Sequence, residues 1–272
     1  MSVEKQIAYN GQIVYWSLTD GTNVDVLRDG LSAIGKAHLI PETQADNAAL
    51  KRAIASVFSD KRTLIRPIPG VVGYAVVHED PNGNEMEYEE EARFGLIDGK
   101  LYSNPLGHHA TERISEIYSF ERKLVTASKL GGVLVRAARE LDGIPLRPRG
   151  GAYWIPDHQA DAWESIVNVV ESSRHGNVTW KLKTTTDENT VNAVCDSLIT
   201  EVEKEIESLT EEIQEGDLGD RGIKNREKRA QELDALVSRY EKRLGKTLTQ
   251  VKEQIAEVEK LAVAALLDSM VA

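Results

Sequence analysis

Arginine, lysine and aromatic residues gather in one part of the sequence. The run from Arg147 to Pro156 reads RPRGGAYWIP, and residues 180–183 read WKLK. Basic side chains can follow phosphates while aromatic rings stack on bases, but the same residues also form cation–π and packing contacts within a protein. The candidate contact residues are Arg147, Arg149, Tyr153, Trp154, Trp180, Lys181 and Lys183.

The overall charge weighs against strong binding of nucleic acid. The chain of 272 residues has 33 Lys+Arg and 44 Asp+Glu, a net charge of −11, and its pI is near 5.2, whereas nucleic-acid-binding domains are typically basic. We therefore favour a structural role for this stretch. Contact with nucleic acid or with another protein remains as an alternative.

One segment partly matches a phosphate-binding loop. Gly30 to Ala37 reads GLSAIGKA, which fits G-x-x-x-x-G-K but has alanine where the full motif needs Ser or Thr for Mg²⁺. We interpret it as an amphipathic helix with a Gly-Lys end. The single cysteine, Cys195, lies on an apolar helical stripe and is predicted to be a core thiol, and it excludes an intrachain disulfide.

Histidines and glutamates offer weak metal-binding signals. His108-His109 is close to Glu112, but no His-Glu-x-x-His motif is present. Five glutamates cluster between Glu85 and Glu91, and they are more typical of a solvated edge strand than of a cation site. The sequence therefore predicts no catalytic residue, no metal ligand and no cofactor.

The pattern of elements predicts an α+β fold with antiparallel sheets and packed helices, followed by a long C-terminal helical hairpin that resembles a coiled coil. Residues 1–107 should form an N-terminal α+β domain with a strand at 13–18, helices after Val24 and Asp46, and a meander from Thr63 to Tyr102 packed on those two helices. Residues 108–186 should form an α-β-β-α-β domain, in which a long helix precedes a tight hairpin at Gly150-Gly151. The prolines should confine that hairpin to a sheet edge.

Residues 187–272 are predicted to be the helical hairpin. They carry 12 basic and 20 acidic residues, and apolar residues recur at helical spacing on either side of a break at 215–222. The second arm is longer than the first, so its unpaired part should need a partner, which makes the second stripe a candidate surface for self-association. Its residues are Leu233, Tyr240, Leu244, Leu248, Val251, Ile255, Val258 and Leu261.

The segment 122–184 resembles a part of uncharacterised proteins from prokaryotic plasmids and phages. The resemblance rests on an R-P-x-G-G-x-Y-x-[IV]-P pattern, with Arg149 at the third position. It implies a mobile-element setting and no activity.

Together these features predict a non-enzymatic, self-associating structural or scaffold protein that forms an oligomer or a filament. Its partner should be another copy of itself, through the second stripe or through sheet edges, and the alternative is a nucleic-acid-associated accessory protein of a plasmid or phage. No run of about 18 apolar residues is present, the first ten residues lack the apolar stretch of a signal peptide, and the fraction of hydrophobic residues, 41%, is too high for a disordered chain. We therefore expect a cytoplasmic protein without a membrane span.

Overall fold

The chain folds into two compact units, and neither is continuous along the sequence. This computed structural model describes residues 9–82, 85–147, 151–185, 187–215 and 218–271. The units comprise residues 1–16, 135–165 and 179–272 in the first, and 17–134 and 166–178 in the second. This division differs from the three consecutive segments expected, 1–107, 108–186 and 187–272, because the first strand pairs with strands that lie far along the chain.

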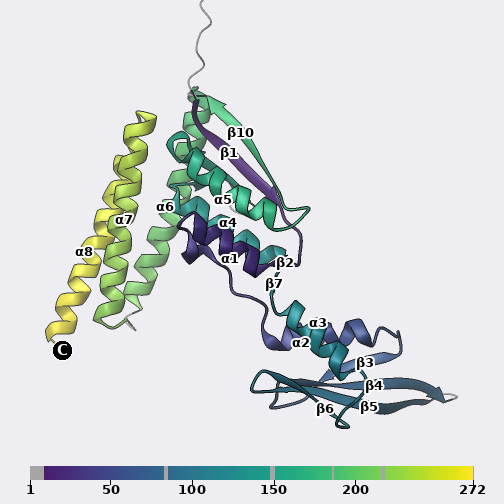
Figure 1. The fold of residues 1–272 in the computed structure, drawn as a ribbon. Coiled ribbons are helices and arrows are strands. Elements are labelled where there is room, and N and C mark those ends of the chain that lie inside the picture. The colour runs from purple at the N-terminus through teal and green to yellow at the C-terminus, as the bar shows by residue number, and fades with distance from the viewer. Residues whose placement is uncertain (1–8, 83–84, 148–150, 186, 216–217, 272) are drawn as a thin grey trace, which may run out of the picture. The chain divides into compact units, whose positions relative to one another are not determined.

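A four-stranded sheet in the first unit accounts for that difference. Its order is β10-β1-β9-β8, with β1 antiparallel to β9 and β9 antiparallel to β8. Figure 1 shows β1 and β10 side by side. The expected pairing of two short strands is present as β8 and β9, while the turn predicted at Gly150-Gly151 falls partly outside the described residues. Only β8 lies at the edge, since β9 is paired on both sides. The strands are β1 Tyr9–Ser17, β8 Ile144–Pro145, β9 Ala152–Pro156 and β10 Val178–Thr185.

Three helices, and not a two-armed hairpin, follow the sheet. They are α6 Glu188–Gln214, α7 Asp220–Leu244 and α8 Thr249–Val271. Each packs on the other two, and Figure 1 shows that the three run alongside one another. The expected second arm is broken at Gly245, which has φ +65° and caps α7 in the left-handed conformation that glycine adopts readily. The chain then turns back into α8.

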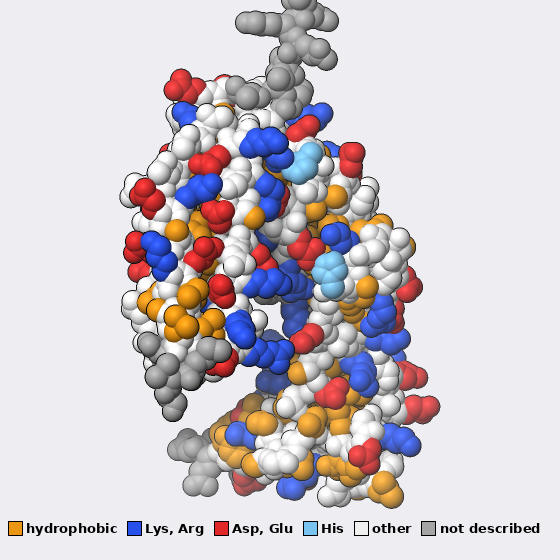
Figure 2. Space-filling view, turned by 90° about the vertical axis from the view of Figure 1, so that its left-hand side faces the viewer, with side chains coloured by type: hydrophobic (Ala, Val, Ile, Leu, Met, Phe, Trp, Pro, Cys, Tyr) orange, Lys and Arg blue, Asp and Glu red, His pale blue; other side chains and the backbone are white. Residues whose placement is uncertain are grey.

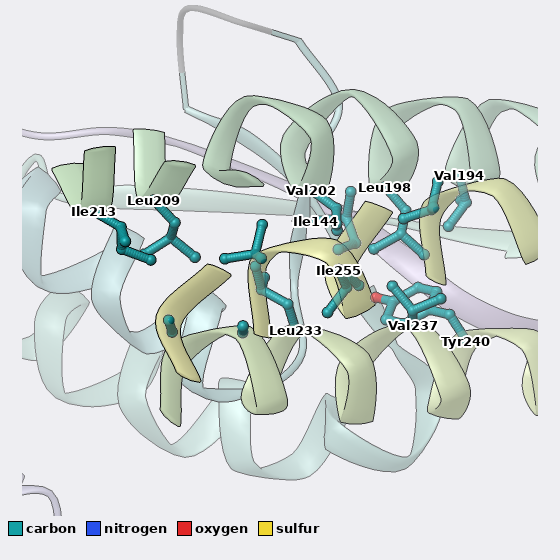
Figure 3. Close-up of a cluster of buried hydrophobic side chains, with 14 of the residues drawn as sticks. Ile144, Val194, Leu198, Val202, Leu209, Ile213, Leu233, Val237, Tyr240 and Ile255 are labelled. Atoms are coloured by element: carbon teal, nitrogen blue, oxygen red, sulfur yellow. The ribbon is translucent and has the colours of Figure 1, made fainter. Parts of the chain in front are cut away.

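The core of this bundle joins it to the sheet. Apolar side chains from all three helices share a core with Ile144 of β8 and Trp154 of β9. Figure 3 shows Ile144 among the side chains of the helices. Trp154 is fully buried, and its ring centroid lies 5.8 Å from that of Tyr240 in α7. The Tyr240 hydroxyl donates to the carbonyl oxygen of Asp142, and burial raises the pKa of Tyr240 far above its usual value. The bundle is therefore part of the same core as the sheet.

The second unit contains the expected antiparallel meander, in the order β3-β4-β5-β6. Its strands are β3 Thr63–Pro67, β4 Gly73–Asn82, β5 Glu85–Ile97 and β6 Lys100–Asn104. The apolar core of this meander is shared with α2 Asp46–Val57 and α3 Thr111–Glu121. The sequence predicted that the helices after Val24 and Asp46 would both cover the meander. The helix after Asp46, α2, does so, but α3 and not the helix after Val24 is the second one.

The predicted long helix after His108 is two helices. A two-residue strand, β7 Leu124–Val125, separates α3 from α4 Ala127–Glu140, and it pairs with β2 Thr22–Asn23. Both glycines of the Gly131-Gly132 pair lie inside α4. The remaining elements are α1 Val24–Ala33, η1 Ala37–Leu39, η2 Asp157–Gln159 and α5 Ala160–Ser173. In the described ranges, no helix has both the length and the apolar character needed to cross a membrane.

Candidate functional site

The aromatic pair of the predicted contact surface is buried. Tyr153 and Trp154 are 6% and 0% exposed. The ring of Tyr153 stacks on Trp16, with centroids 5.7 Å apart, and burial raises the pKa of its hydroxyl. Trp154 donates its Nε1–H to Thr184 Oγ1 at 2.9 Å. Neither ring can stack on a base, so for this pair the structural interpretation holds.

The basic residues of the same prediction do not form one surface. Arg147 is exposed, while Arg149 lies outside the described residues. Lys181 lies on β10 and donates to Glu164 Oε2 of α5 at 2.5 Å, and Lys183 is exposed on the same strand. Figure 2 views the molecule from the side of α7 and α8, where many basic side chains lie among acidic ones. With Tyr153 and Trp154 buried and Lys181 paired, the described residues of the prediction do not form a basic, aromatic groove that follows phosphates.

Exposed apolar side chains lie along β10 instead. Trp180 is 42% exposed and Leu182 is 56% exposed. The Trp180 ring stacks on Tyr15 of β1, with centroids 5.1 Å apart and an interplanar angle of 17°. Because side chains alternate along a strand, Trp180 and Leu182 project from the face opposite Lys181. We call Tyr15, Trp180 and Leu182 the β10 edge patch.

The position of β10 makes this patch unusual. Among the described strands, β10 is the last in the order of its sheet, so its outer edge has no strand beside it. An unpaired edge presents backbone N–H and C=O groups that can bind a further strand. The sequence named Trp180 but missed Tyr15 and Leu182. Apolar and polar residues alternate from 178 to 183, which shows that Trp180 and Leu182 share one face of the strand. The alternation does not reveal whether the rest of the protein covers that face.

The residues predicted for self-association lie inside the chain's own bundle. Leu233, Tyr240, Val251, Ile255 and Val258 are between 1% and 3% exposed. Three more are partly buried against the same cluster, namely Leu244, Leu248 and Leu261. The sequence correctly identified an apolar stripe. The stripe lies on α7 and α8. These two helices pack against each other and against α6, so the stripe is covered and is not free to contact a second copy.

A hollow of about 460 Å³ lies in the first unit, between the sheet and the bundle. Three of the arginines that line it are paired with acidic residues. The pairs are Arg139–Glu201 at 2.8 Å, Arg229–Glu205 at 2.5 Å and Arg239–Asp142 at 2.7 Å. These pairs are partly exposed, so each adds little stability. The acidic partners offset the positive charge of the three arginines, and an anion site would need that charge.

The phosphate-loop and cysteine interpretations agree with the structure. The Gly30–Ala37 segment spans the end of α1, and Gly35 follows the helix with φ +71°. The helix that begins there, η1 at Ala37, has only three residues, too few to offer a set of N-terminal amides to a phosphate. Cys195 is buried in α6, and burial raises the pKa of its thiol, as expected for a core residue rather than a nucleophile.

Three histidines and a glutamate come together in the second unit. Glu91 Oε2 lies 2.5 Å from His78 Nε2, and Glu91 Oε1 lies 3.2 Å from His108 Nε2. The rings of His108 and His109 have centroids 4.2 Å apart. Glu91, His108 and His109 each offer a ligand atom, and these atoms lie within 4.8 Å of one another. This is the candidate metal centre in the described residues.

A β-bulge directs Glu91 into this cluster. In the pairing of β4 with β5, Val77 faces Glu90 and Val76 faces Ala92, which leaves Glu91 as the extra residue. A bulge inserts one residue and re-aims its side chain. The sequence assigned Glu91 to a solvated edge because a bulge depends on the partner strand and leaves no local signal.

His108 is held firmly beside Glu91. Its side chain is only 8% exposed, and the edge of its ring meets Phe94 with centroids 5.3 Å apart. Its Nδ1 accepts the backbone N–H of Ala110 at 3.2 Å, so Nε2 carries the proton and donates to Glu91. The hydrogen bond from His78, with a smaller contribution from His108, holds the pKa of the Glu91 carboxyl below its usual value.

The cluster borders an open hollow of about 850 Å³, which gives it access to solvent. His108 and His109 line one part of the hollow, and Glu112 and Ser115 of α3 line another. The sequence placed His108, His109 and Glu112 at the start of a helix. It treated His78 as isolated because that residue lies 30 positions earlier on another element.

Comparison with known proteins identifies a family without assigning a function. Residues 10–270 match the model of a family of unknown function, DUF6744, and the chain therefore belongs to that family. No curated protein and no solved structure matches the chain.

Proposed function

We propose that this member of a family without an assigned function is a non-enzymatic structural protein that pairs with a second copy of itself along β10. The β10 edge patch carries the proposal, because it combines an unpaired strand edge with exposed apolar side chains. Exposed apolar patches on strand edges are typical of surfaces that other chains cover. A second strand would cover both features at once.

Self-pairing fits this strand because the pattern of side chains is self-complementary. If two β10 strands pair antiparallel about a two-fold axis through Lys181, Trp180 of one copy lies opposite Leu182 of the other. Both apolar residues lie on the same face, so the pair buries them together. A two-fold contact uses the same surface on both copies and closes as a dimer, so this contact alone predicts no filament.

The lysines on β10 affect how strong this contact is. Lysine on an edge strand commonly prevents edge-to-edge association. Here Lys181 is paired with Glu164 of its own chain, which offsets its charge. An eight-residue strand also offers a small interface. We therefore expect a weak, concentration-dependent dimer that persists at high salt, because its contacts are backbone hydrogen bonds and apolar side chains.

The nucleic-acid alternative loses its main support. It depended on aromatic rings beside arginines, and Tyr153 and Trp154 are buried. No observation on the described residues favours it over self-pairing, so we do not retain it as a second function.

Sedimentation of the full chain across concentration tests the proposal. Leu182→Asp places a charge in the β10 edge patch and should shift the protein to monomer at concentrations where the wild type dimerises. Leu267→Asp is the matched control, because Leu267 is 59% exposed on α8 of the same unit. It should leave the wild-type mass unchanged.

Two results would overturn the proposal. One is a wild type that stays monomeric at the highest attainable concentration. The other is a dimer that Leu267→Asp dissociates and Leu182→Asp does not, which would place the contact on the end of α8.

A further inference from the structure

We propose that Glu91, His108 and His109 bind a divalent transition-metal ion of the Zn²⁺ class. The three ligand atoms already lie within 4.8 Å of one another, so small side-chain movements bring them around one ion. The proposal is independent of self-pairing, because the cluster belongs to the second unit and the β10 edge patch to the first.

The types of ligand select the class of metal. Two imidazoles and one carboxylate suit Zn²⁺ and similar first-row ions, whereas Mg²⁺ and Ca²⁺ prefer oxygen ligands alone. Three protein ligands leave a fourth position for water or another ligand. The adjoining hollow gives that position a route to solvent.

His78 would act as a positioning residue for the carboxylate. Its Nε2 lies 2.5 Å from Glu91 Oε2, and its Nδ1 lies 3.2 Å from Thr63 Oγ1. Glu91 Oε2 is therefore held by His78, while Oε1 faces His108 and is available to an ion. Ligating carboxylates are commonly held by a hydrogen bond of this kind.

Binding requires one proton to move within His108. At present Nε2–H donates to Glu91, and Nδ1 accepts from Ala110. An ion would take the Nε2 lone pair, so the proton must pass to Nδ1 through solvent, and the 3.2 Å bond from Ala110 must give way. No net proton is released by His108. This rearrangement lowers the affinity below that of a fully preformed site.

The competing explanation is a hydrogen-bonded cluster that only fixes the bulge and the loop before α3. His109 separates the two explanations, because it is exposed and its described ring contact is with His108, not with a strand. A structural cluster depends on His78, Glu91 and His108 and does not need His109. A metal site needs it as a ligand.

Calorimetric titration of the untagged full chain with ZnCl₂ tests the proposal. We expect one ion per chain, with binding weakened at least about tenfold in His109→Ala and about 10- to 100-fold in His78→Ala. His175→Ala is the matched control, since His175 is an exposed histidine of the same unit outside the cluster. It should bind as the wild type does.

Titration with CoCl₂ gives a second readout. Ligation by imidazole should produce visible absorption bands that His109→Ala loses and His175→Ala keeps. The proposal is wrong if the wild type shows no stoichiometric binding of either ion. It is also wrong if His109→Ala binds as tightly as His175→Ala.

Discussion

Tyr153 and Trp154 show why residue types alone did not settle their role. An aromatic pair beside arginines is compatible with stacking on bases and with packing in a core. The deciding fact is burial, which results from the pairing of β9 between β1 and β8. That pairing joins residues far apart in the sequence, so no local pattern could reveal it.

For Glu91 and the histidines, the sequence missed a cluster that the structure brings together. Each histidine looked ordinary by itself, because a metal site is recognised from the spacing of ligands on one element. Here the ligands come from a bulge in β5 and from the loop before α3. The adjacent pair His108-His109 was the one local signal. The carboxylate that completes the cluster could not be selected from five nearby glutamates.

Asp187 gives a test of pH dependence at the scale of one residue. It caps α6, and its carboxylate accepts hydrogen bonds from Thr185 Oγ1 at 2.6 Å and from the backbone N–H of Thr190 at 3.0 Å. These bonds hold its pKa far below the usual value. A lowered pKa in the folded state stabilises the fold at neutral pH, and this contribution is lost as pH falls below about 5.

We therefore expect Asp187→Asn to remove part of this pH dependence while keeping a capping oxygen. The free energy of unfolding should be lower than that of the wild type at pH 7, and the two values should converge as the pH is lowered. Urea unfolding at several pH values measures this. A difference that stays constant with pH would contradict the role given to the carboxylate.

At the scale of elements, strong periodicity predicted the type of most helices and strands but not where helices end. The stripe from Leu233 to Leu261 predicts a single arm, since its apolar spacing continues through Gly245. The structure ends α7 at Leu244 and turns the chain back. A helix stop at glycine is a local signal. The apolar spacing is the same before and after Gly245, so the spacing alone does not reveal that the helix ends there.

Gly245 provides a prediction for this turn. Its φ is +65°, and a Cβ added there would meet nothing within 4 Å, so the cost of a side chain is conformational. Gly245→Ala should lower the free energy of unfolding by about 1–2 kcal/mol. Gly245→Asn should cost less, because asparagine tolerates this conformation. Chemical denaturation measures both. Equal stability of Gly245→Ala and wild type would contradict the left-handed cap.

At the scale of the whole molecule, the sequence predicted the α+β class and the antiparallel meander, but not the interleaving of the two units. The apolar stripe that seemed to need a second copy is covered within the chain. Ile255, at its centre, is 1% exposed, so Ile255→Asp would disrupt the bundle and could not report on association. Self-association is therefore best tested on β10.

Disulfide formation across β10 tests the central claim most directly. Single cysteines would replace Thr179, Lys181 or Lys183 in separate variants, with Lys204→Cys on α6 as the exposed control. The native Cys195 is buried with a raised thiol pKa, which limits its competition.

In an antiparallel pair about a two-fold axis, a residue close to the axis faces its own copy at a distance that a disulfide can span. Under mild oxidation we predict a linked dimer that forms most readily with Lys181→Cys, the position that faces its own copy, and that exceeds the control. If all three positions link no more than Lys204→Cys, the two chains do not pair along β10.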